Sequence, residues 1–155
     1  TVNFVRAEPR GMNYVDRVET NWAFRVALPV GTHVPFHCTA SGKLYMASLP
    51  AVQRKALLAS LELTPLTPNT FTDPALLADE LGTIRKDGYS LDREEFHDAM
   101  VAIAVPVTDN RDRFYAALAI HGPTQRFSLD NALERRDMLV SYARRIGDLL
   151  FPATS

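Results

Sequence analysis

The chain has 155 residues, of which 46% are hydrophobic and 23% are charged, and its formal net charge is −1. This length suits one domain, and the hydrophobic content is enough for a real core. The near balance of 17 basic and 18 acidic residues gives no basic surface for nucleic acid. No apolar run reaches the roughly 18 residues that a membrane-spanning helix needs, so we expect no membrane association. Cys38 is the one cysteine and cannot form an intramolecular disulfide, which favours a reducing, cytoplasmic location.

The first 28 residues predict three strands. Residues 2–6 and 14–18 are β-like, and the turn-forming residues 9–11 lie between them, so we expect an antiparallel hairpin. Residues 22–28 predict a third strand that ends at Pro29. The chain does not begin with Met, and its first strand looks cut from something larger, so we expect additional sequence upstream.

Two helices are predicted next. The apolar run at residues 44–49 indicates a helix whose first turn lies at or near residues 39–41. Pro50 opens the second helix at its first turn, where a missing N–H has no cost. An apolar face runs along this second helix, made of Val52, Ala56, Leu57 and Leu61.

A threonine- and proline-rich stretch, residues 64–72, predicts a loop before the third helix. Asp73 is expected as the N-cap of that helix, with Pro74 at its first position and Gly88 at its end. The polar residues 92–95 then predict a loop or the lead-in to a short strand.

Two strands, at residues 101–107 and 114–121, are joined by a polar turn. Because side chains alternate along a strand, each strand has a bulky and a small face. The bulky faces hold Ile103, Val105 and Val107 with Phe114, Ala116, Leu118 and Ile120; the small faces hold Ala102 and Ala104 with Tyr115, Ala117, Ala119 and His121. The bulky faces suit packing against a helix. The small faces could border a cavity, or could pack against a large side chain such as Tyr89 or Phe96.

The last predicted element is one long helix that starts at the N-cap Ser128 and continues to about Leu150. Its apolar stripe consists of Leu129, Ala132, Leu133, Leu139, Ala143, Ile146 and Leu150. Helices and antiparallel strands together indicate an α+β domain.

Residues 37–43, His-Cys-Thr-Ala-Ser-Gly-Lys, are a candidate anion site. Small side chains at Ala40, Ser41 and Gly42 let a ligand approach the backbone. The first amides of a helix lack intrahelical partners and lie at the positive end of its dipole, where a carboxylate binds well. The alternative is purely structural: Thr39 caps a core helix and Gly42 permits close packing.

Gly31 and Pro35, followed by residues 37–43, resemble the G-x-x-x-P-x-H-x-T-A-x-G-K signature of the IclR-type transcriptional regulators. Further stretches match in order: residues 72–74, 84–90, Asp92 with Glu94 and Glu95, 103–107, 116–120, and Gly122-Pro123. The resemblance covers almost the whole chain, residues 1–155, and corresponds to the C-terminal effector-binding domain. The winged helix-turn-helix DNA-binding domain of that family is not in this chain.

This resemblance implies a GAF- or profilin-like fold, in which helices flank a curved antiparallel sheet with a pocket on one side. It further implies that the pocket binds small organic acids or aromatic compounds, partly through backbone amides at the positions matching Ala40 and Ser41. The residues expected around the ligand are Thr39, Ala40, Ser41, Asp92, Met100, Ala102, Ala119, His121, Val26 and Val34.

Three positions depart from relatives with small oxo-acid ligands. Those relatives carry a cysteine where this chain has Ala102, and two serines where it has Ala119 and His121. Because unpaired polar groups are costly to bury, the same ligand in the same pose is disfavoured. We therefore predict a different carboxylate, aromatic or bulkier, with His121 near its polar end. His121 could alternatively be a satisfied core histidine or a surface residue.

Other chemistry has weaker support. Cys38 and His37 are adjacent in sequence and adjacent side chains rarely face each other, so nucleophilic catalysis is not expected. A zinc site could be assembled only in three dimensions, from His33, His37, His97, His121 or Asp92, and we expect no metal and no cofactor.

The acidic residues Asp92, Glu94 and Glu95 could act as paired carboxylates, but such clusters are more often solvated loops. We expect Asp92 alone to face the pocket. We also expect Lys43 to face solvent.

The leading prediction is a binding module of a bacterial regulator. A small carboxylate effector would modulate operator binding by the missing DNA-binding domain, which would be the only contact with DNA. The resemblance implies a homo-oligomer, either a dimer or a tetramer. The alternatives are a stand-alone GAF-like sensor and, with less support, a hydrolase that uses Cys38 or the region of Asp92.

Overall fold

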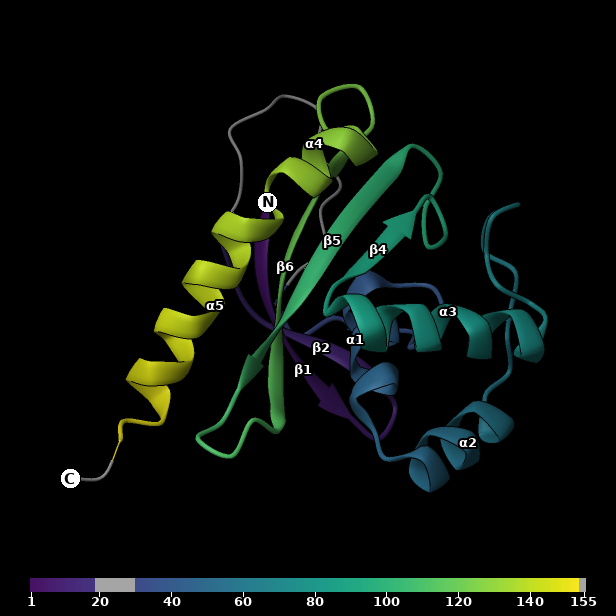
Figure 1. Ribbon diagram of the computed structural model, residues 1–155. Coiled ribbons are helices and arrows are strands. Elements are labelled where there is room, and N and C mark those ends of the chain that lie inside the picture. The colour runs from purple at the N-terminus through teal and green to yellow at the C-terminus, as the bar shows by residue number, and fades with distance from the viewer. Residues whose placement is uncertain (19–29, 154–155) are drawn as a thin grey trace.

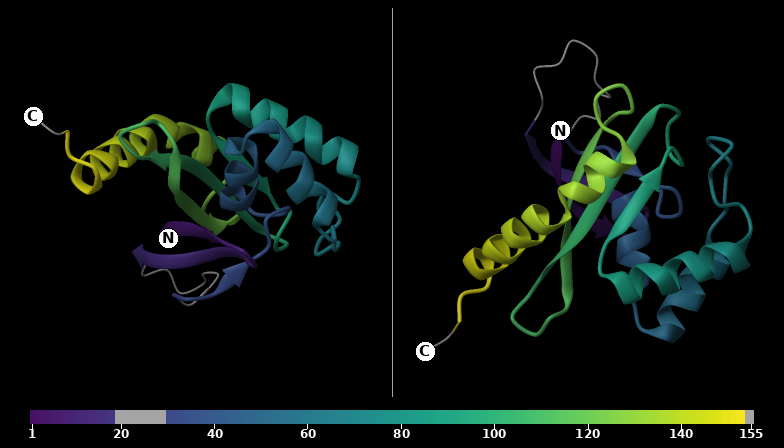
Figure 2. Two further views of the ribbon diagram at one scale, coloured as in Figure 1. Left: turned by 90° about the horizontal axis from the view of Figure 1, so that it is seen from below. Right: turned by 45° about the horizontal axis from the view of Figure 1, so that its top comes forward.

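Six strands of the chain form one curled antiparallel sheet in the order β3-β2-β1-β6-β5-β4 (Figures 1 and 2). The computed structural model describes residues 1–18 and 30–153. In chain order the elements are β1 (Val2–Glu8), β2 (Gly11–Val18), β3 (His33–Val34), α1 (Ala40–Ser48), α2 (Ala51–Ser60), α3 (Pro74–Asp87), β4 (Ser90–Arg93), β5 (Met100–Thr108), β6 (Phe114–Pro123), α4 (Leu129–Glu134) and α5 (Arg136–Leu150). The predicted hairpin of β1 and β2 is confirmed. The strand predicted at residues 22–28 lies outside the described residues.

Helices cover both faces of this sheet (Figure 1). α1 packs on one face, with α3 against α1, and α4 and α5 pack on the other, so the sheet lies between two hydrophobic clusters. The predicted α+β architecture, a curved antiparallel sheet flanked by helices, is confirmed. Among the described residues, no helix is long and apolar enough to cross a membrane.

The start of α1 is fixed by local contacts. Thr39 is its N-cap, and its hydroxyl oxygen accepts the N–H of Gly42 at 3.0 Å while donating to the carbonyl of Pro35 at 2.8 Å. Gly42 has no room for a side chain, because a Cβ there would lie 2.4 Å from the carbonyl oxygen of Phe36. The cap and the close packing expected from the sequence are therefore both present, and α1 begins at Ala40.

The second and third helices differ in how well they follow the sequence. For α3, Asp73 caps the helix, Pro74 opens it, and Gly88 ends it with a φ of 80°, as predicted. For α2, Pro50 is the N-cap rather than part of the first turn, and none of the helix's residues is fully buried. Its predicted apolar face is only partly buried, since Val52 is 82% exposed. α2 lies at the edge of the molecule, where few neighbours can cover it (Figure 1).

The single long helix predicted at the C-terminus is wrong. Ser128 caps α4 and forms a capping box with Asn131, but the helix ends at Arg135 and α5 begins at Arg136. The N–H of Arg135 donates to the carbonyl of Ala132 at 3.1 Å. This bond spans three residues, as in a 3₁₀ turn, instead of the four of an α-helix, and the helix axis changes direction there (Figure 1). An apolar stripe in the sequence indicates which side of a helix is buried, but it does not indicate where the helix axis changes direction.

Because of a bulge in β6, the predicted faces of Phe114 and Tyr115 are wrong. Val107 pairs with Ala116 but Thr108 pairs with Phe114, so Tyr115 is the extra residue. Phe114 consequently turns towards α1, where its ring centre lies 5.5 Å from that of Tyr45. Tyr115 takes the opposite face, 4.9 Å from the ring centre of Phe151. Beyond the bulge, the bulky and small faces lie as predicted, on the α5 side and the α1 side respectively.

Lys43 contradicts the prediction that it faces solvent. Its side chain is fully buried, and its ammonium lies 2.9 Å from a carboxylate oxygen of Glu80, 2.9 Å from one of Glu95 and 2.8 Å from the carbonyl oxygen of Leu91. Glu95, expected in a solvated loop, is buried as well. The reason is tertiary: α3 and the end of β4 bring acceptors to Lys43 from 37 to 52 residues away in the chain.

We expect Lys43→Met to destabilise the domain by about 3 to 5 kcal/mol, because it leaves two carboxylates near each other without their cation. Urea denaturation at pH 7 measures this free energy of unfolding. Lys55→Met on the exposed side of α2 is the matched control and should change it by less than about 0.5 kcal/mol. Equal stability of the two variants would show that the buried cluster contributes nothing.

Candidate functional site

A small cavity lies at the N-terminal end of α1. It is lined by Asn3, Tyr14, Thr39, Ala40, Ser41, Asp92, Phe96, Met100, Ala102, Ala119 and His121. These residues come from β1, β2, β4, β5, β6, α1 and the loop after β4, so elements that are distant in sequence meet here. The candidate site is therefore a product of the whole fold rather than of one motif.

Most of the residues expected around a ligand line this cavity; the exceptions are Val26 and Val34. Val26 lies outside the described residues. Val34 does not line the cavity: it is buried in the core on β3, where it pairs with Met12 of β2. Its position at the edge of the sheet explains the difference, since the cavity is bordered by the central strands and by β4.

Two backbone donors lie at the floor of the cavity. Within the described part of the chain, the N–H groups of Ala40 and Ser41 have no hydrogen-bond acceptor, because the Thr39 cap serves Gly42 instead. Both residues are buried, so water is largely excluded from these donors. Unpaired amides at the positive end of a helix form a site for an anion.

Asp92 lines the same cavity and has a raised pKa. Burial raises the pKa of Asp92 to about 7, and the nearby Glu95 carboxylate adds to the increase. One of its oxygens accepts the N–H of Glu95 at 2.7 Å, which fixes the side chain in place. Near neutral pH, Asp92 is therefore present both as a carboxylate and as a protonated acid that can donate a hydrogen bond.

His121, which also lines the cavity, is held by Asn3. The side-chain nitrogen of Asn3 lies 2.7 Å from Nδ1 of His121, and Arg17 Nε donates to the amide oxygen of Asn3 at 3.4 Å. Arginine can only donate, so the Asn3 oxygen faces Arg17 and its NH₂ faces the imidazole. Nδ1 of His121 is then the acceptor in this contact. His121 is only 4% exposed, which excludes the surface position.

Sequence reasoning missed two lining residues and misjudged a third. Asn3 and Tyr14 were not singled out, although a polar residue on the buried face of a strand is a signal that could have identified Asn3. Burial raises the pKa of Tyr14 to about 12, so its hydroxyl keeps its proton and remains a donor. Phe96 was considered only as a packing partner, and it does line the cavity.

A model of the family described as "Bacterial transcriptional regulator IclR C-terminal" matches residues 1–148 of this chain. The chain belongs to the IclR family. Two curated relatives are the probable transcriptional regulator SauR of Cupriavidus necator, 41% identical over 133 residues, and the transcriptional repressor IclR of Escherichia coli, 30% identical over 132 residues. The matches cover 86% and 85% of this chain but 53% and 48% of the relatives, so the chain spans about half of their length.

Solved structures agree with the family. The IclR protein of Thermotoga maritima has a TM-score of 0.85 and 32% identity over 94% of this chain and 61% of its own. A double mutant of the PobR inducer binding domain from Acinetobacter, in complex with 3-hydroxy benzoic acid, has a TM-score of 0.87 and 25% identity over 96% of this chain and 87% of its own. The IclR family consists of transcriptional regulators rather than enzymes, in agreement with the sequence analysis.

Cys38 has no catalytic setting in this IclR-family domain. Burial raises the pKa of the Cys38 thiol to about 12, with the Asp92 and Glu95 carboxylates adding to the increase, so the thiolate is scarce. His37 is directed to the carbonyl of Thr64, 2.9 Å away. Among the described residues, no group of three or more His, Cys, Asp or Glu side chains is placed to hold a metal ion.

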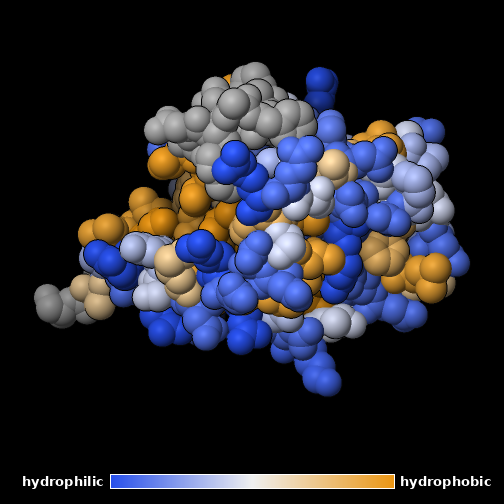
Figure 3. Space-filling model, turned by 90° about the horizontal axis from the view of Figure 1, so that it is seen from above, coloured by the Kyte–Doolittle hydropathy of each residue, from blue (hydrophilic) through white to orange (hydrophobic). Residues whose placement is uncertain are grey.

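A larger hollow of about 640 Å³ lies on the opposite face of the sheet, between α5 and strands β1, β2 and β6. It is lined mainly by apolar side chains, with Asp16, Arg17 and Asn3 as its polar members, and hydrophobic residues gather on this α5 side of the surface (Figure 3). Specific small-molecule sites need a few converging polar groups. The small cavity collects such groups from several elements, so it is the better candidate for the site.

We expect the stability of the domain to fall as pH rises from about 4 to 7, in part because of Asp92. Between its ordinary pKa of 3.8 and its folded pKa of about 7, the folded state holds a proton that the unfolded state has released. Asp92→Asn should remove about 2 to 3 kcal/mol of the stability difference between pH 5 and pH 8, measured by urea denaturation.

Asp79→Asn, on the exposed side of α3, is the control and should leave the pH dependence of stability unchanged. A pH dependence that is the same in Asp92→Asn and the wild type would show that Asp92 titrates normally.

Proposed function

We propose that this IclR-family domain binds a small organic carboxylate in the cavity at the N-terminus of α1. The single observation that carries the proposal is the pair of buried, unpartnered N–H groups of Ala40 and Ser41 at a cavity that is also lined by Asp92 and His121. Such amides need an acceptor, and a carboxylate supplies two oxygens that can accept both.

Asp92 supports a ligand that is an acid. An anion close to Asp92 favours its protonated form, and a protonated acid can donate to the ligand. Because burial already raises the pKa of Asp92 to about 7, little free energy is needed to protonate it at neutral pH. The ligand carboxylate would then meet donors from the helix and from the side chain.

The side chains of the lining on β5 and β6 support an aromatic or bulkier acid. Ala102 and Ala119 present only methyl groups there, and His121 stands beside them as the polar element. The PobR inducer binding domain, similar in fold, was solved with 3-hydroxy benzoic acid, an aromatic acid that carries a second polar group. We propose that the effector has the same general character, with its second polar group near His121.

The effector would act on a DNA-binding domain in the part of the protein that this chain does not span. Ligand binding changes operator affinity only if the ligand binds one arrangement of domains or subunits more tightly than another. We propose that the domain assembles as a dimer or tetramer and that occupancy of the cavity selects one arrangement. Operator binding by the full-length protein, with and without the acid, measures this coupling.

We expect Ala40→Pro to weaken acid binding by about ten- to a hundredfold, the value of one hydrogen bond to a charged group. Ala40 is the first residue of α1 and Thr39 has an extended backbone, so proline removes the N–H without breaking the helix. Calorimetry with benzoate, 3-hydroxybenzoate and pyruvate measures the affinities.

Ala51→Pro, at the exposed first position of α2, is the matched control and should bind as the wild type does. Unchanged affinity in Ala40→Pro would show that the amides do not hold the acid. Tight binding of pyruvate with no aromatic acid bound would contradict the proposed ligand class.

We expect the affinity for benzoate to fall by up to about tenfold per pH unit above pH 7, because binding then requires Asp92 to take up a proton. Calorimetry at pH 6, 7 and 8 measures this, since benzoate stays ionised throughout. The same titration of Asp92→Asn should show no such fall; a slope that persists in this variant would assign it to another group.

A further inference from the structure

The cavity is far smaller than the ligand that it is proposed to hold. Its volume is about 10 Å³, which is about the room that one water molecule needs. Pockets for small organic ligands commonly enclose about 300 to 1,000 Å³. An acid with several carbon atoms can therefore enter only if part of the lining moves away.

Most of the lining is fixed. Asn3, Tyr14, Ala102 and Ala119 lie on central strands of the sheet, each paired to a neighbour on both sides. The floor is fixed too, because the Thr39 cap holds the start of α1 and Lys43 ties the helix to β4 and α3. Among the described lining residues, Phe96 alone lies outside a helix, a strand or a helix cap.

Phe96 is carried by the loop at residues 94–99, which is held at both ends. Thr67 and Thr70 donate their hydroxyls to the carbonyls of Glu94 and Glu95, each at 2.6 Å. At the other end, the N–H of Ala99 donates to the Glu94 carboxylate at 2.9 Å. Glu94 and Ala99 have φ values of 56° and 60°, so the backbone turns sharply at both of these residues.

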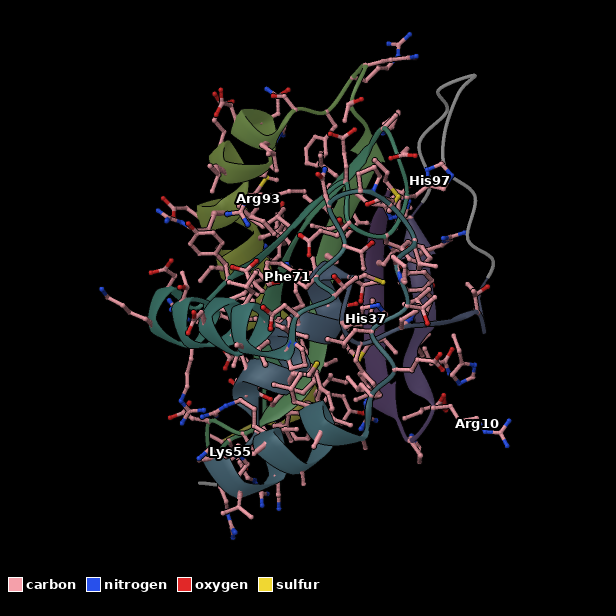
Figure 4. The ribbon with its side chains drawn as sticks, turned by 90° about the vertical axis from the view of Figure 1, so that its right-hand side faces the viewer. Arg10, His37, Lys55, Phe71, Arg93 and His97 are labelled. Atoms are coloured by element: carbon pink, nitrogen blue, oxygen red, sulfur yellow. The ribbon has the colours of Figure 1, made fainter. Side chains whose placement is uncertain are left out.

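The middle of this loop meets solvent on its outer side. His97 and Asp98 are exposed, and Figure 4 labels Arg93 and His97, which flank the turn that carries Phe96. Phe96 itself is half-buried and packs against the hydrophobic cluster that contains Ala102 and Ala119. The ring can therefore leave the cavity without breaking the pairing of the sheet.

We infer that Phe96 is the residue that determines which acids enter: its ring fills the space that the body of the effector takes, and the effector binds by displacing it. This rests on the proposed function, and it adds the element that sets ligand size. A ligand meets the open site only in the fraction of molecules whose ring has left, so the ring lowers the apparent affinity by that fraction. A small acid needs a smaller displacement of the ring, so its apparent affinity is lowered less.

The test compares the wild type with Phe96→Ala by calorimetry with benzoate and pyruvate. We expect Phe96→Ala to bind benzoate at least tenfold more tightly than the wild type, and to bind pyruvate more tightly by a smaller factor. Phe96→Leu should give an intermediate affinity for benzoate. Phe71→Ala is the matched control, since Phe71 is also half-buried against the same cluster but lies over Lys43 rather than in the cavity (Figure 4).

Benzene is the second probe, because an apolar void opened by removal of a ring binds it without any carboxylate. In Phe96→Ala, benzene should shift the ¹³C-methyl signals of Ala102 and Ala119 saturably, and in Phe71→Ala it should not. Benzene binding without benzoate binding would uphold the role of Phe96 and overturn the carboxylate ligand. Benzoate binding that weakens in Phe96→Ala, or the absence of any benzene binding there, would overturn the role of Phe96.

Discussion

The candidate site depends on the contacts of the buried Lys43 ammonium. The ammonium joins α1 to α3 through Glu80 and to the end of β4 through Glu95 and the carbonyl of Leu91. Of these segments, α1 supplies the floor of the cavity and β4 supplies one of its walls. The Lys43 ammonium donates to these three acceptors and does not line the cavity. The donors at the cavity floor are therefore the amides of Ala40 and Ser41. Lys43, the fourth residue of α1, thus organises a cavity that it does not line.

Local signals in the sequence predicted the element boundaries that local chemistry determines. Thr39, Asp73 and Ser128 each cap a helix through a side-chain oxygen, and Gly88 ends one in a left-handed conformation, as their types and neighbours indicated. The ordered motifs, through their resemblance to the IclR family, also identified most of the residues that line the cavity. Those motifs carry information about distant contacts that periodicity and capping do not contain.

Features that depend on distant partners could not be predicted from the chain alone. The burial of Lys43 requires acceptors supplied by α3 and the end of β4. No residue near Lys43 in the sequence indicates that these acceptors are present. The bulge at Tyr115 reverses the face of Phe114 without any turn-forming residue to mark it. The volume of the cavity depends on where the ring of Phe96 comes to rest, which is a property of the folded loop and not of its composition.

Asn3 gives the sheet a further property, because it lines both the small cavity and the larger apolar hollow against α5. Asn3 of β1 therefore lies between the two spaces. The residue whose amide contacts the ring of His121 therefore also lines the hollow on the α5 side. A substitution of Asn3 therefore changes both the shape of the hollow on the α5 side and the hydrogen bonding in the cavity, so the two cannot vary independently at this position.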